Sequence, residues 1–401
     1  MDPKTFLSLP SLMPLVGLSL LFFLCISCQP SSQISKLDGR TFSPRELDDK
    51  VVTLMQEAKV TGLALAIFNE GKPIYQQAYG YADRSTQDSL KLDHVFYAAS
   101  FSKAVFGYVV SELVHQGIME LDTPLQSYLP MPIPEIPTAK AWRSLAPLTG
   151  DARYEDITAR MCLSHTTGLP NWRWIEDDQQ LKFRFDPGTR YRYSGEGIML
   201  LQWVVEHLTQ KPYEDLAKEM VFEPLAMVHS GYLWEEEWEE HFCYGHDQAE
   251  QKIPKKKEKE DAAAAGSMQT TLLDYSRFVA HLFELYRQSS PVTQQMFTPS
   301  VRIRSIAQFG PLSDRDSSAN DDIELSYGLG WGLLQSPYGV GAFKEGHDHG
   351  FQHYSIVFPE AGVGIIIMTN SDQGESIFKE LLEYAIGDTF TPWRWENYVP
   401  Y

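Results

Sequence analysis

The chain has 401 residues, of which 43% are hydrophobic and 12% aromatic, and it carries a formal net charge of −19. This composition predicts a globular protein with a large core and excludes an intrinsically disordered chain. The negative charge repels phosphate backbones, so nucleic acid is not an expected partner.

The sequence has four cysteines. Two belong to the N-terminal apolar region, and the other two are more readily explained as buried free thiols than as a disulfide. No Cys or His spacing typical of a metal site is present, so no metal is expected.

The N-terminus differs in kind from the rest of the chain. The apolar run from Leu12 to Ser27 is shorter than the ~20 residues that span a bilayer as a helix, and it fits the core of a secretory signal. The Ser27-Cys28 step resembles a bacterial lipobox, in which cleavage before Cys28 leaves that cysteine to carry lipid. An ordinary signal peptide or a short membrane anchor is the alternative. We expect a signal peptide over 1–28, lipidation of Cys28, a tether over 29–41, and an exported, membrane-anchored lipoprotein of the bacterial envelope, either periplasmic or on the surface.

Hydrophobic periodicity and turn signals predict the elements of the remaining chain. In chain order they are helix 44–59 behind a capping box, strands 63–68 and 74–81, helices 101–116, 156–164, 196–209, 213–221 and 272–286, strands 327–331, 354–358 and 363–369, and helix 374–386. Strands therefore stand at both ends of the chain and helices between them. The economical fold is α+β: one antiparallel sheet built from both chain ends, flanked by the first and last helices, with an inserted helical subdomain. This domain is expected over 42–387, followed by a C-terminal tail over 388–401.

Ser100 and Lys103 are the first candidates for chemistry. They are three residues apart at the start of a predicted helix, so they lie on one face about one turn apart. A serine needs a nearby base to become a strong nucleophile, and lysine can be that base where burial favours the neutral amine. The free N–H groups at a helix start also favour a developing negative charge. Ser376 and Lys379 repeat the spacing, but Lys379 is expected to face solvent. Ser100, in contrast, follows an apolar segment and begins an apolar helix.

The surroundings of Ser100 extend this interpretation. The matching segments are 96–130, 157–170, 185–216, 222–227, 266–278, 327–331 and 362–372. Together, in this order, they resemble the serine β-lactamase and penicillin-binding family, in its class C-like branch. The resemblance covers about 42–387. It implies a β-lactamase/transpeptidase-like fold and an acyl-enzyme mechanism that needs no cofactor.

The resemblance also implies further site residues. Tyr193 stands where the family has the tyrosine of a Tyr-x-Asn element, opposite the nucleophile, and is the expected third catalytic group. Gly195 replaces the asparagine of that element, and this departure affects β-lactam or peptide recognition more than acyl transfer. The family's strand element, Lys-Thr-Gly or His-x-Gly, is sought between Glu345 and Phe351. There His347 fits the first position and His349 is a rival, followed by Gly350, and these residues are expected near the substrate and the oxyanion hole.

The resulting hypothesis is a serine hydrolase. Ser100 attacks an ester or amide carbonyl, Lys103 and Tyr193 handle its proton, and water releases the acyl-enzyme. Gly195 favours an esterase-like activity, and a β-lactamase or a D-alanyl or D-amino-acid peptidase is the alternative. An alternative of another class is a non-catalytic cleft-binding or sensor lipoprotein. The expected partner is a small-molecule or peptide-like substrate, the membrane is reached only through the N-terminal lipid or signal anchor, and the oligomeric state is left open.

Overall fold

The computed structural model describes residues 33–138, 140–254, 257 and 259–401. The expected signal peptide over 1–28 and the lipidation of Cys28 lie outside the described residues. Within the described part, no helix combines the length and apolar character needed to cross a membrane.

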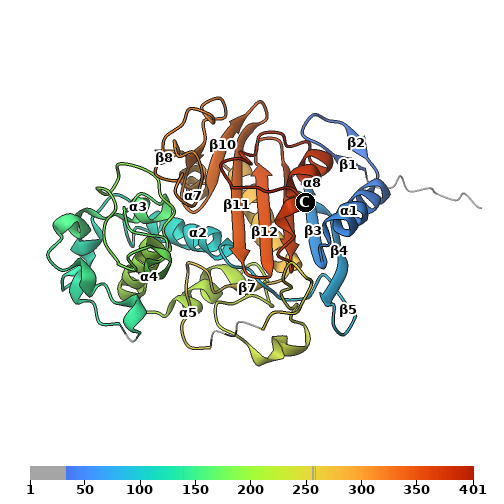
Figure 1. The fold of residues 1–401 in the computed structure, drawn as a ribbon. Helices are drawn as coiled ribbons and strands as arrows, with labels where there is room; N and C mark the ends of the chain where they lie inside the picture. Colours follow the sequence, from blue (N-terminus) through green and yellow to red (C-terminus); the bar gives the residue numbers. More distant parts are fainter. Residues whose placement is uncertain (1–32, 139, 255–256, 258) are drawn as a thin grey trace, which may run out of the picture. The chain divides into compact units, whose positions relative to one another are not determined.

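The centre of the fold is a nine-stranded antiparallel sheet built from both ends of the chain (Figure 1). Strand β3 (Gly62–Asn69), near the start of the chain, pairs along its length with β13 (Val363–Thr369), near its end. The spatial order is β5-β4-β3-β13-β12-β11-β10-β9-β8. The remaining strands of the sheet are β4 (Lys72–Asp83), β5 (Asp88–Ser89), β8 (Val301–Arg302), β9 (Ser326–Tyr327), β10 (Gly332–Ser336), β11 (Gly339–Asp348) and β12 (Phe351–Phe358). The predicted antiparallel sheet is therefore confirmed.

The side chains of β3 point alternately to the two faces of the sheet, and both faces are buried. Leu63, Leu65 and Ile67 face a core shared with α1 (Pro44–Ala58) and α8 (Phe378–Ala385), which lie side by side in Figure 1. Ala64, Ala66 and Phe68 face the opposite core, which is shared with α6 (Leu272–Arg287). The predicted capping box at Ser43 forms, since the side chains of Ser43 and Glu46 each accept a hydrogen bond from the other's backbone N–H.

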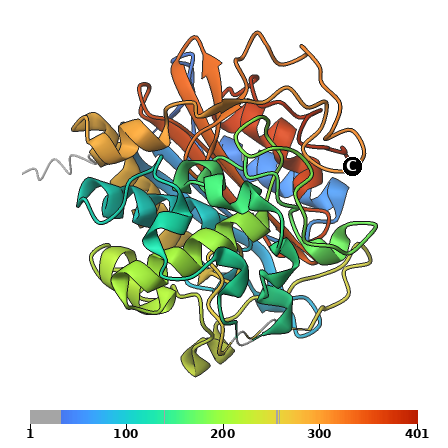
Figure 2. The ribbon, with the colours of Figure 1, turned by 90° about the vertical axis from the view of Figure 1, so that its left-hand side faces the viewer.

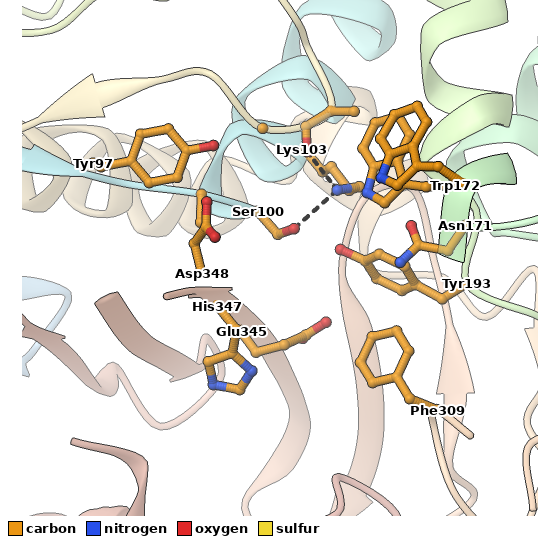
Figure 3. Close-up of a pocket in the computed structure, with 14 residues that line it drawn as sticks. Tyr97, Ser100, Lys103, Asn171, Trp172, Tyr193, Phe309, Glu345, His347 and Asp348 are labelled. Atoms are coloured by element: carbon orange, nitrogen blue, oxygen red, sulfur yellow. Dashed lines mark hydrogen bonds between the residues drawn. The ribbon is translucent and has the colours of Figure 1, made fainter. Parts of the chain in front are cut away.

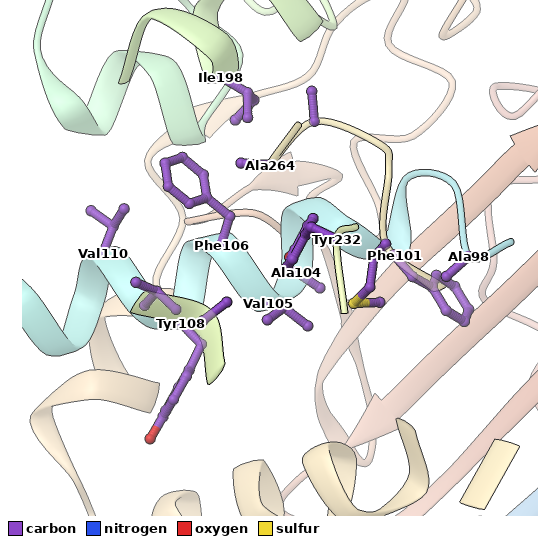
Figure 4. Close-up of a cluster of buried hydrophobic side chains, with 14 of the residues drawn as sticks. Ala98, Phe101, Ala104, Val105, Phe106, Tyr108, Val110, Ile198, Tyr232 and Ala264 are labelled. Carbon is purple, nitrogen blue, oxygen red and sulfur yellow. The ribbon is translucent and has the colours of Figure 1, made fainter. Parts of the chain in front are cut away.

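Helix α2 (Phe101–His115) is the central helix of the molecule. Nearly all its residues are buried, and Figure 4 shows its apolar side chains pointing to several sides at once. Phe101 stacks on Tyr275 of α6 with ring centroids 4.3 Å apart. A helix that is apolar all round must be enclosed by its neighbours, and this enclosure holds its N-terminus, with Ser100, in a fixed place.

The inserted helical region follows α2, and Figure 2 views it from its own side, in front of the sheet. Its helices are α3 (Ala159–Leu163), α4 (Gly195–Thr209) and α5 (Tyr213–Ala217), with α7 (Pro291–Met296) packed against α2 further along the chain. Short 3₁₀ helices cover Leu125–Tyr128, Ile133–Glu135, Ala141–Arg143, Ala146–Leu148, Ala152–Asp156, Arg173–Ile175, Glu236–Glu240 and Glu375–Ile377, and one π turn covers Lys218–Phe222. Two small sheets pair β1 (Ile34–Ser35) with β2 (Thr41–Phe42) and β6 (Phe96–Tyr97) with β7 (Gln269–Thr270).

The structure differs from the prediction at one expected strand and adds a strand that was not expected. The strand expected over 327–331 ends at Tyr327, and the chain turns before β10. Gly330 in this turn has φ +82° and lies against α2, where a Cβ would come within 2.7 Å of the Lys103 carbonyl oxygen. Strand β11 was not predicted as an element of its own, although it borders the site.

The structure revises both ends of the expected domain. From residue 33 the expected tether is packed onto the domain, because Ile34 is fully buried and the Leu37 N–H donates to the Ile386 carbonyl. The expected C-terminal tail is also folded, since Trp395 is buried and its indole N–H donates to the Ser305 hydroxyl. The tail prediction failed because the segment is rich in aromatic residues that cover the outer core of the sheet.

Candidate active site

A cavity of about 390 Å³ opens where the start of α2 meets the edge of β11 (Figure 3). The residues that line it are Tyr97, Ala99, Ser100, Lys103, Asn171, Trp172, Trp174, Tyr193, Ala265, Gly266, Phe309, Glu345, His347 and Asp348. The three predicted catalytic side chains thus share one cavity, although Tyr193 comes from a segment far from Ser100 and Lys103 in sequence.

Lys103 lies directly behind Ser100. Its Nζ is 2.9 Å from the Ser100 Oγ and also donates to the Ala265 carbonyl oxygen. Lys103 is 2% exposed. Burial lowers the pKa of Lys103 well below its usual value, and the positive charge of Lys344 lowers it further. A neutral amine at this distance can accept the Ser100 proton, which is what the chemistry of a serine nucleophile needs.

The backbone around Ser100 is set by close packing. Ser100 is the N-cap of α2, and Ala99 before it has φ +47°, a conformation that costs an L-residue ~1–2 kcal/mol. Gly346 of β11 lies against this segment, where a Cβ would come within 2.8 Å of the Ala98 carbonyl oxygen. Glycine at 346 therefore lets β11 approach the nucleophile, and the strand forms one wall of the cavity.

Tyr193 is held between two lysines. The Lys103 and Lys344 Nζ atoms lie 4.9 and 5.2 Å from the centroid of its ring, and the Lys344 Nζ donates to the Tyr193 hydroxyl at 3.3 Å. Burial raises the pKa of Tyr193, while Lys344 and the Ser100 hydroxyl oppose that shift without cancelling it. The phenol therefore stays protonated near neutral pH.

Lys344 and Glu345 form a buried ion pair that was not identified from the sequence. Their side chains are 0% and 4% exposed, and the Lys344 Nζ lies 3.0 Å from the Glu345 Oε1. Burial alone would lower the pKa of Lys344, but the Glu345 carboxylate and Tyr193 raise it above its usual value. Lys344-Glu345-Gly346 has the Lys-x-Gly pattern of the expected strand element. That element was expected between Glu345 and Phe351, one residue after its lysine, and the Lys-x-Gly pattern is the sequence signal that identifies it.

The residues first proposed for this element are placed differently from one another. His347 lines the cavity, with its Nε2 3.7 Å from the Glu375 carboxylate. His349 and Gly350 form the turn between β11 and β12, outside the cavity lining. The His349 ring faces Asp372 at 2.8 Å, and the Gly350 N–H donates to the same carboxylate. The structure therefore brings His347 to Ser100 but not His349 or Gly350.

Trp172 leaves no room for a side chain at position 195. A Cβ at this position would lie 2.6 Å from the Trp172 Cζ2, so the indole occupies the space that an asparagine side chain would need. Trp172 stacks on Trp174 at 4.9 Å between centroids, and both line the cavity. The neighbouring Asn171 also lines it and accepts the Gly195 N–H at 3.1 Å through its side-chain oxygen. An amide is therefore present beside Tyr193, but it comes from another loop.

His165 has a supporting position. It is fully buried, packs on the Tyr193 ring with centroids 4.2 Å apart, and accepts the Ser194 N–H through Nδ1. Burial, and then the lysines nearby, lower its pKa well below the usual value, so the ring is neutral. These contacts hold the segment that carries Tyr193 in place. Cys162 and Cys243 are buried free thiols, as expected from the sequence.

The profile of the beta-lactamase family matches residues 47–386. The chain belongs to the beta-lactamase family. Its members include serine hydrolases, and this membership confirms the resemblance described from the sequence. The putative penicillin-binding protein PbpX of Bacillus subtilis is 23% identical over 63% of this chain, and the esterase EstB of Burkholderia gladioli is 25% identical over 49%. The chain covers 62% and 53% of the lengths of these two relatives.

A solved class C beta-lactamase supports the fold. It superposes with a TM-score of 0.67 at 19% identity, covering 85% of this chain and 96% of that one. A putative penicillin-binding protein, an esterase and a solved class C beta-lactamase are thus all similar to this chain, so family membership alone does not identify the substrate.

Proposed function

We propose that this protein is a serine hydrolase that forms an acyl-enzyme on Ser100 and acts on esters in preference to amides or β-lactams. The observation that carries the proposal is the 2.9 Å contact between the Lys103 Nζ and the Ser100 Oγ, at a buried position that lowers the pKa of that amine. The pair is a nucleophile within hydrogen-bond reach of its base, and Tyr193 stands beside it as a third group.

The proton takes a defined route in this proposal. As Ser100 attacks the carbonyl carbon, its proton passes to the neutral Lys103 amine. The protonated Tyr193 then donates to the leaving oxygen or nitrogen and regains a proton from Lys103. The charged Lys344, 3.3 Å from the Tyr193 hydroxyl, stabilises the phenolate that forms in passing. Water attacks the acyl-enzyme by the reverse route and frees Ser100.

Backbone N–H groups complete the site. Ser100 stands at the N-terminus of α2, where N–H groups lack intrahelical acceptors, and His347 stands on the cavity edge of β11. We assign the N–H groups of these two residues to the negative oxygen of the tetrahedral intermediate. His349 and Gly350 have no part in this assignment, because they lie outside the cavity lining.

The preference for esters rests on Gly195 and Trp172. The position that offers an amide in the family's Tyr-x-Asn element has no side chain here, and an indole fills the space. Asn171 brings an amide to the same cavity, but its side-chain oxygen already accepts the Gly195 N–H. Recognition of a substrate amide next to the scissile bond therefore loses an acceptor. The similarity to an esterase across 49% of this chain supports the same preference.

The N-terminal segment is part of the proposal. We propose that cleavage before Cys28 leaves a lipid-bearing cysteine, which anchors the hydrolase in the bacterial envelope. Metabolic labelling with a fatty-acid analogue tests this, with Cys28→Ala expected to lose the label.

Turnover of p-nitrophenyl butyrate and of nitrocefin tests the function. We expect steady ester hydrolysis by the wild type, loss of at least a thousandfold in Ser100→Ala, and wild-type rates in Ser376→Ala. Ser376 is the matched control because it heads the other Ser-x-x-Lys in the chain, whose Lys379 side chain is 47% exposed. Nitrocefin turnover equal to ester turnover would instead make the protein a β-lactamase. No turnover of either by a folded protein would favour a non-catalytic cleft.

A further inference from the structure

One side of the catalytic cavity is an aromatic wall, formed by Trp172, Trp174 and Phe309. Phe309 packs edge-on against the Tyr193 ring, with centroids 5.4 Å apart. Trp172 stacks on Trp174, with centroids 4.9 Å and planes 10° apart. Figure 3 shows Trp172, Tyr193 and Phe309 together on one side of the nucleophile. A group bound beside Tyr193 therefore meets aromatic surface.

The aromatic wall keeps apolar surface that the fold itself does not cover. Trp174 is 46% exposed and Phe309 is 37% exposed, although both are large apolar side chains. Trp142, which is also exposed, packs edge-on against Trp174 with centroids 5.7 Å apart, so the exposed indoles are contiguous and not scattered. Contiguous aromatic surface that lines a cavity is typical of a site where a ligand is bound.

Acidic and basic side chains that line the cavity are already engaged with the protein. Lys103 donates to the Ala265 carbonyl oxygen, and Glu345 pairs with Lys344 at 3.0 Å. Asp348 accepts the N–H of the residue that follows it. A charged substrate group would have to compete with these contacts, whereas an apolar group has only to displace water from the rings. The aromatic wall is therefore the part of the cavity best suited to recognise a substrate beyond its reacting bond.

The position of Tyr193 decides which part of the substrate reaches the aromatic wall. In the proposed mechanism Tyr193 donates its proton to the leaving oxygen, so that oxygen must lie within reach of the Tyr193 hydroxyl. The carbonyl oxygen points instead to the N–H groups assigned to it, those of Ser100 and His347. The group attached to the leaving oxygen is thus the part of the substrate that lies against the aromatic wall.

We propose that the aromatic wall is the leaving-group subsite, and that the preferred substrates are esters of alcohols that carry an aromatic ring, as benzyl esters do. Two stacked indoles and a phenyl ring offer the stacked and edge-to-face contacts that an aromatic ring fills better than an aliphatic chain. This inference rests on the proposed hydrolase function and on the role of Tyr193 within it, because it names the substrates of the same site.

A pair of isomeric esters tests which side of the ester bond carries the ring. Benzyl acetate carries it on the leaving group, methyl phenylacetate carries it on the acyl group, and ethyl acetate has no ring. Each kcat/KM is divided by the rate constant for hydrolysis by hydroxide, which removes differences in intrinsic reactivity. We expect benzyl acetate to exceed both other esters by about tenfold or more, the gain from burying one ring. A smaller difference, or a faster methyl phenylacetate, would overturn the leaving-group assignment.

Cyclohexylmethyl acetate tests whether the subsite requires an aromatic ring. Its leaving group is apolar and of similar size, but it is not flat and cannot stack. We expect its kcat/KM to be about threefold or more below that of benzyl acetate. Equal values for these two esters would overturn the aromatic preference.

Trp174→Ala and Phe309→Ala identify the rings responsible. We expect each change to lower the ratio of benzyl acetate to ethyl acetate turnover about fivefold or more. The ratio is the decisive readout, because a general loss of activity cancels in it. The matched control is Tyr401→Ala, which removes a similarly exposed aromatic ring that hydrogen-bonds Glu57 and Glu380 outside the cavity lining, and it should leave the ratio unchanged. A ratio preserved in Trp174→Ala or in Phe309→Ala would refute the aromatic wall as the subsite.

A binding measurement separates this inference from the hydrolase function. Benzyl acetate is titrated into Ser100→Ala protein and followed by saturation-transfer NMR, where no turnover is needed. We expect Trp174→Ala in the same background to weaken its binding about fivefold or more. Unchanged binding would overturn the aromatic subsite even in an active hydrolase. Weakened binding, together with no ester turnover by the wild type, would leave the ring-binding wall standing and the hydrolase function refuted.

Discussion

Replacing Lys103 by methionine should make the protein inactive and more stable. Burial lowers the pKa of Lys103 in the fold, so the lysine binds its proton less tightly in the folded protein than in the unfolded chain. At ~1.4 kcal/mol per pH unit between pH 7 and the usual lysine pKa of 10.5, this difference favours the unfolded chain by at most about 5 kcal/mol at pH 7. Methionine removes that cost and fills a similar volume, while the lost hydrogen bond to the Ala265 carbonyl costs ~1–3 kcal/mol. We expect a net gain in stability of up to about 2 kcal/mol at pH 7, with ester turnover reduced ~10²–10⁴-fold.

Urea unfolding followed by tryptophan fluorescence measures this at pH 7 and pH 10. The folded-state pKa of Lys103 is depressed, so the wild type gains stability as pH rises toward 10.5 and the advantage of Lys103→Met shrinks. Lys344→Met is the matched control, since its pKa is raised by Glu345. That change leaves a buried carboxylate without its partner and should cost about 3–5 kcal/mol. A destabilised Lys103→Met protein at pH 7, or an advantage that does not change with pH, would refute the reasoning.

Three further predictions concern the same site. In a pH–rate profile, kcat/KM should rise on the acid side as Lys103 loses its proton, well below pH 10.5, because its pKa is depressed; a rise centred near 10.5 would contradict the neutral amine. Tyr193→Phe should lower ester turnover at least a hundredfold, whereas Tyr191→Phe, which removes a buried hydroxyl without a hydrogen-bond partner among the described residues, should leave it within a few-fold, and equal losses would show a packing role only. Gly195→Asn should destabilise the fold by ~1–3 kcal/mol in thermal unfolding, because its Cβ meets the Trp172 ring; an unchanged melting temperature would show that the indole moves freely.

The elements with strong local signals were predictable. The capping box at Ser43, the turn between β3 and β4, and the apolar run of α2 each encode their own conformation, and the structure reproduces them. Strand β11 lacked such a signal. It carries Lys344 and Glu345 at buried positions. Hydrophobic periodicity assigns charged residues to the surface, so a strand that contains a buried ion pair is not recognised by that signal.

The site was predictable in part for a related reason. Ser100 and Lys103 are one helical turn apart, so local geometry brings them together. Tyr193 was placed by resemblance to a family, not by spacing. The contact between Gly195 and Trp172 joins two loops through packing, and the sequence of neither segment alone predicts it.

The central claim is that Ser100 is an activated nucleophile, and intact mass after reaction with a fluorophosphonate tests it most directly. Wild-type and Ser376→Ala proteins should each gain the mass of a single phosphonyl group, and Ser100→Ala should gain none. An adduct that persists in Ser100→Ala, or no adduct on folded wild-type protein, would contradict the account.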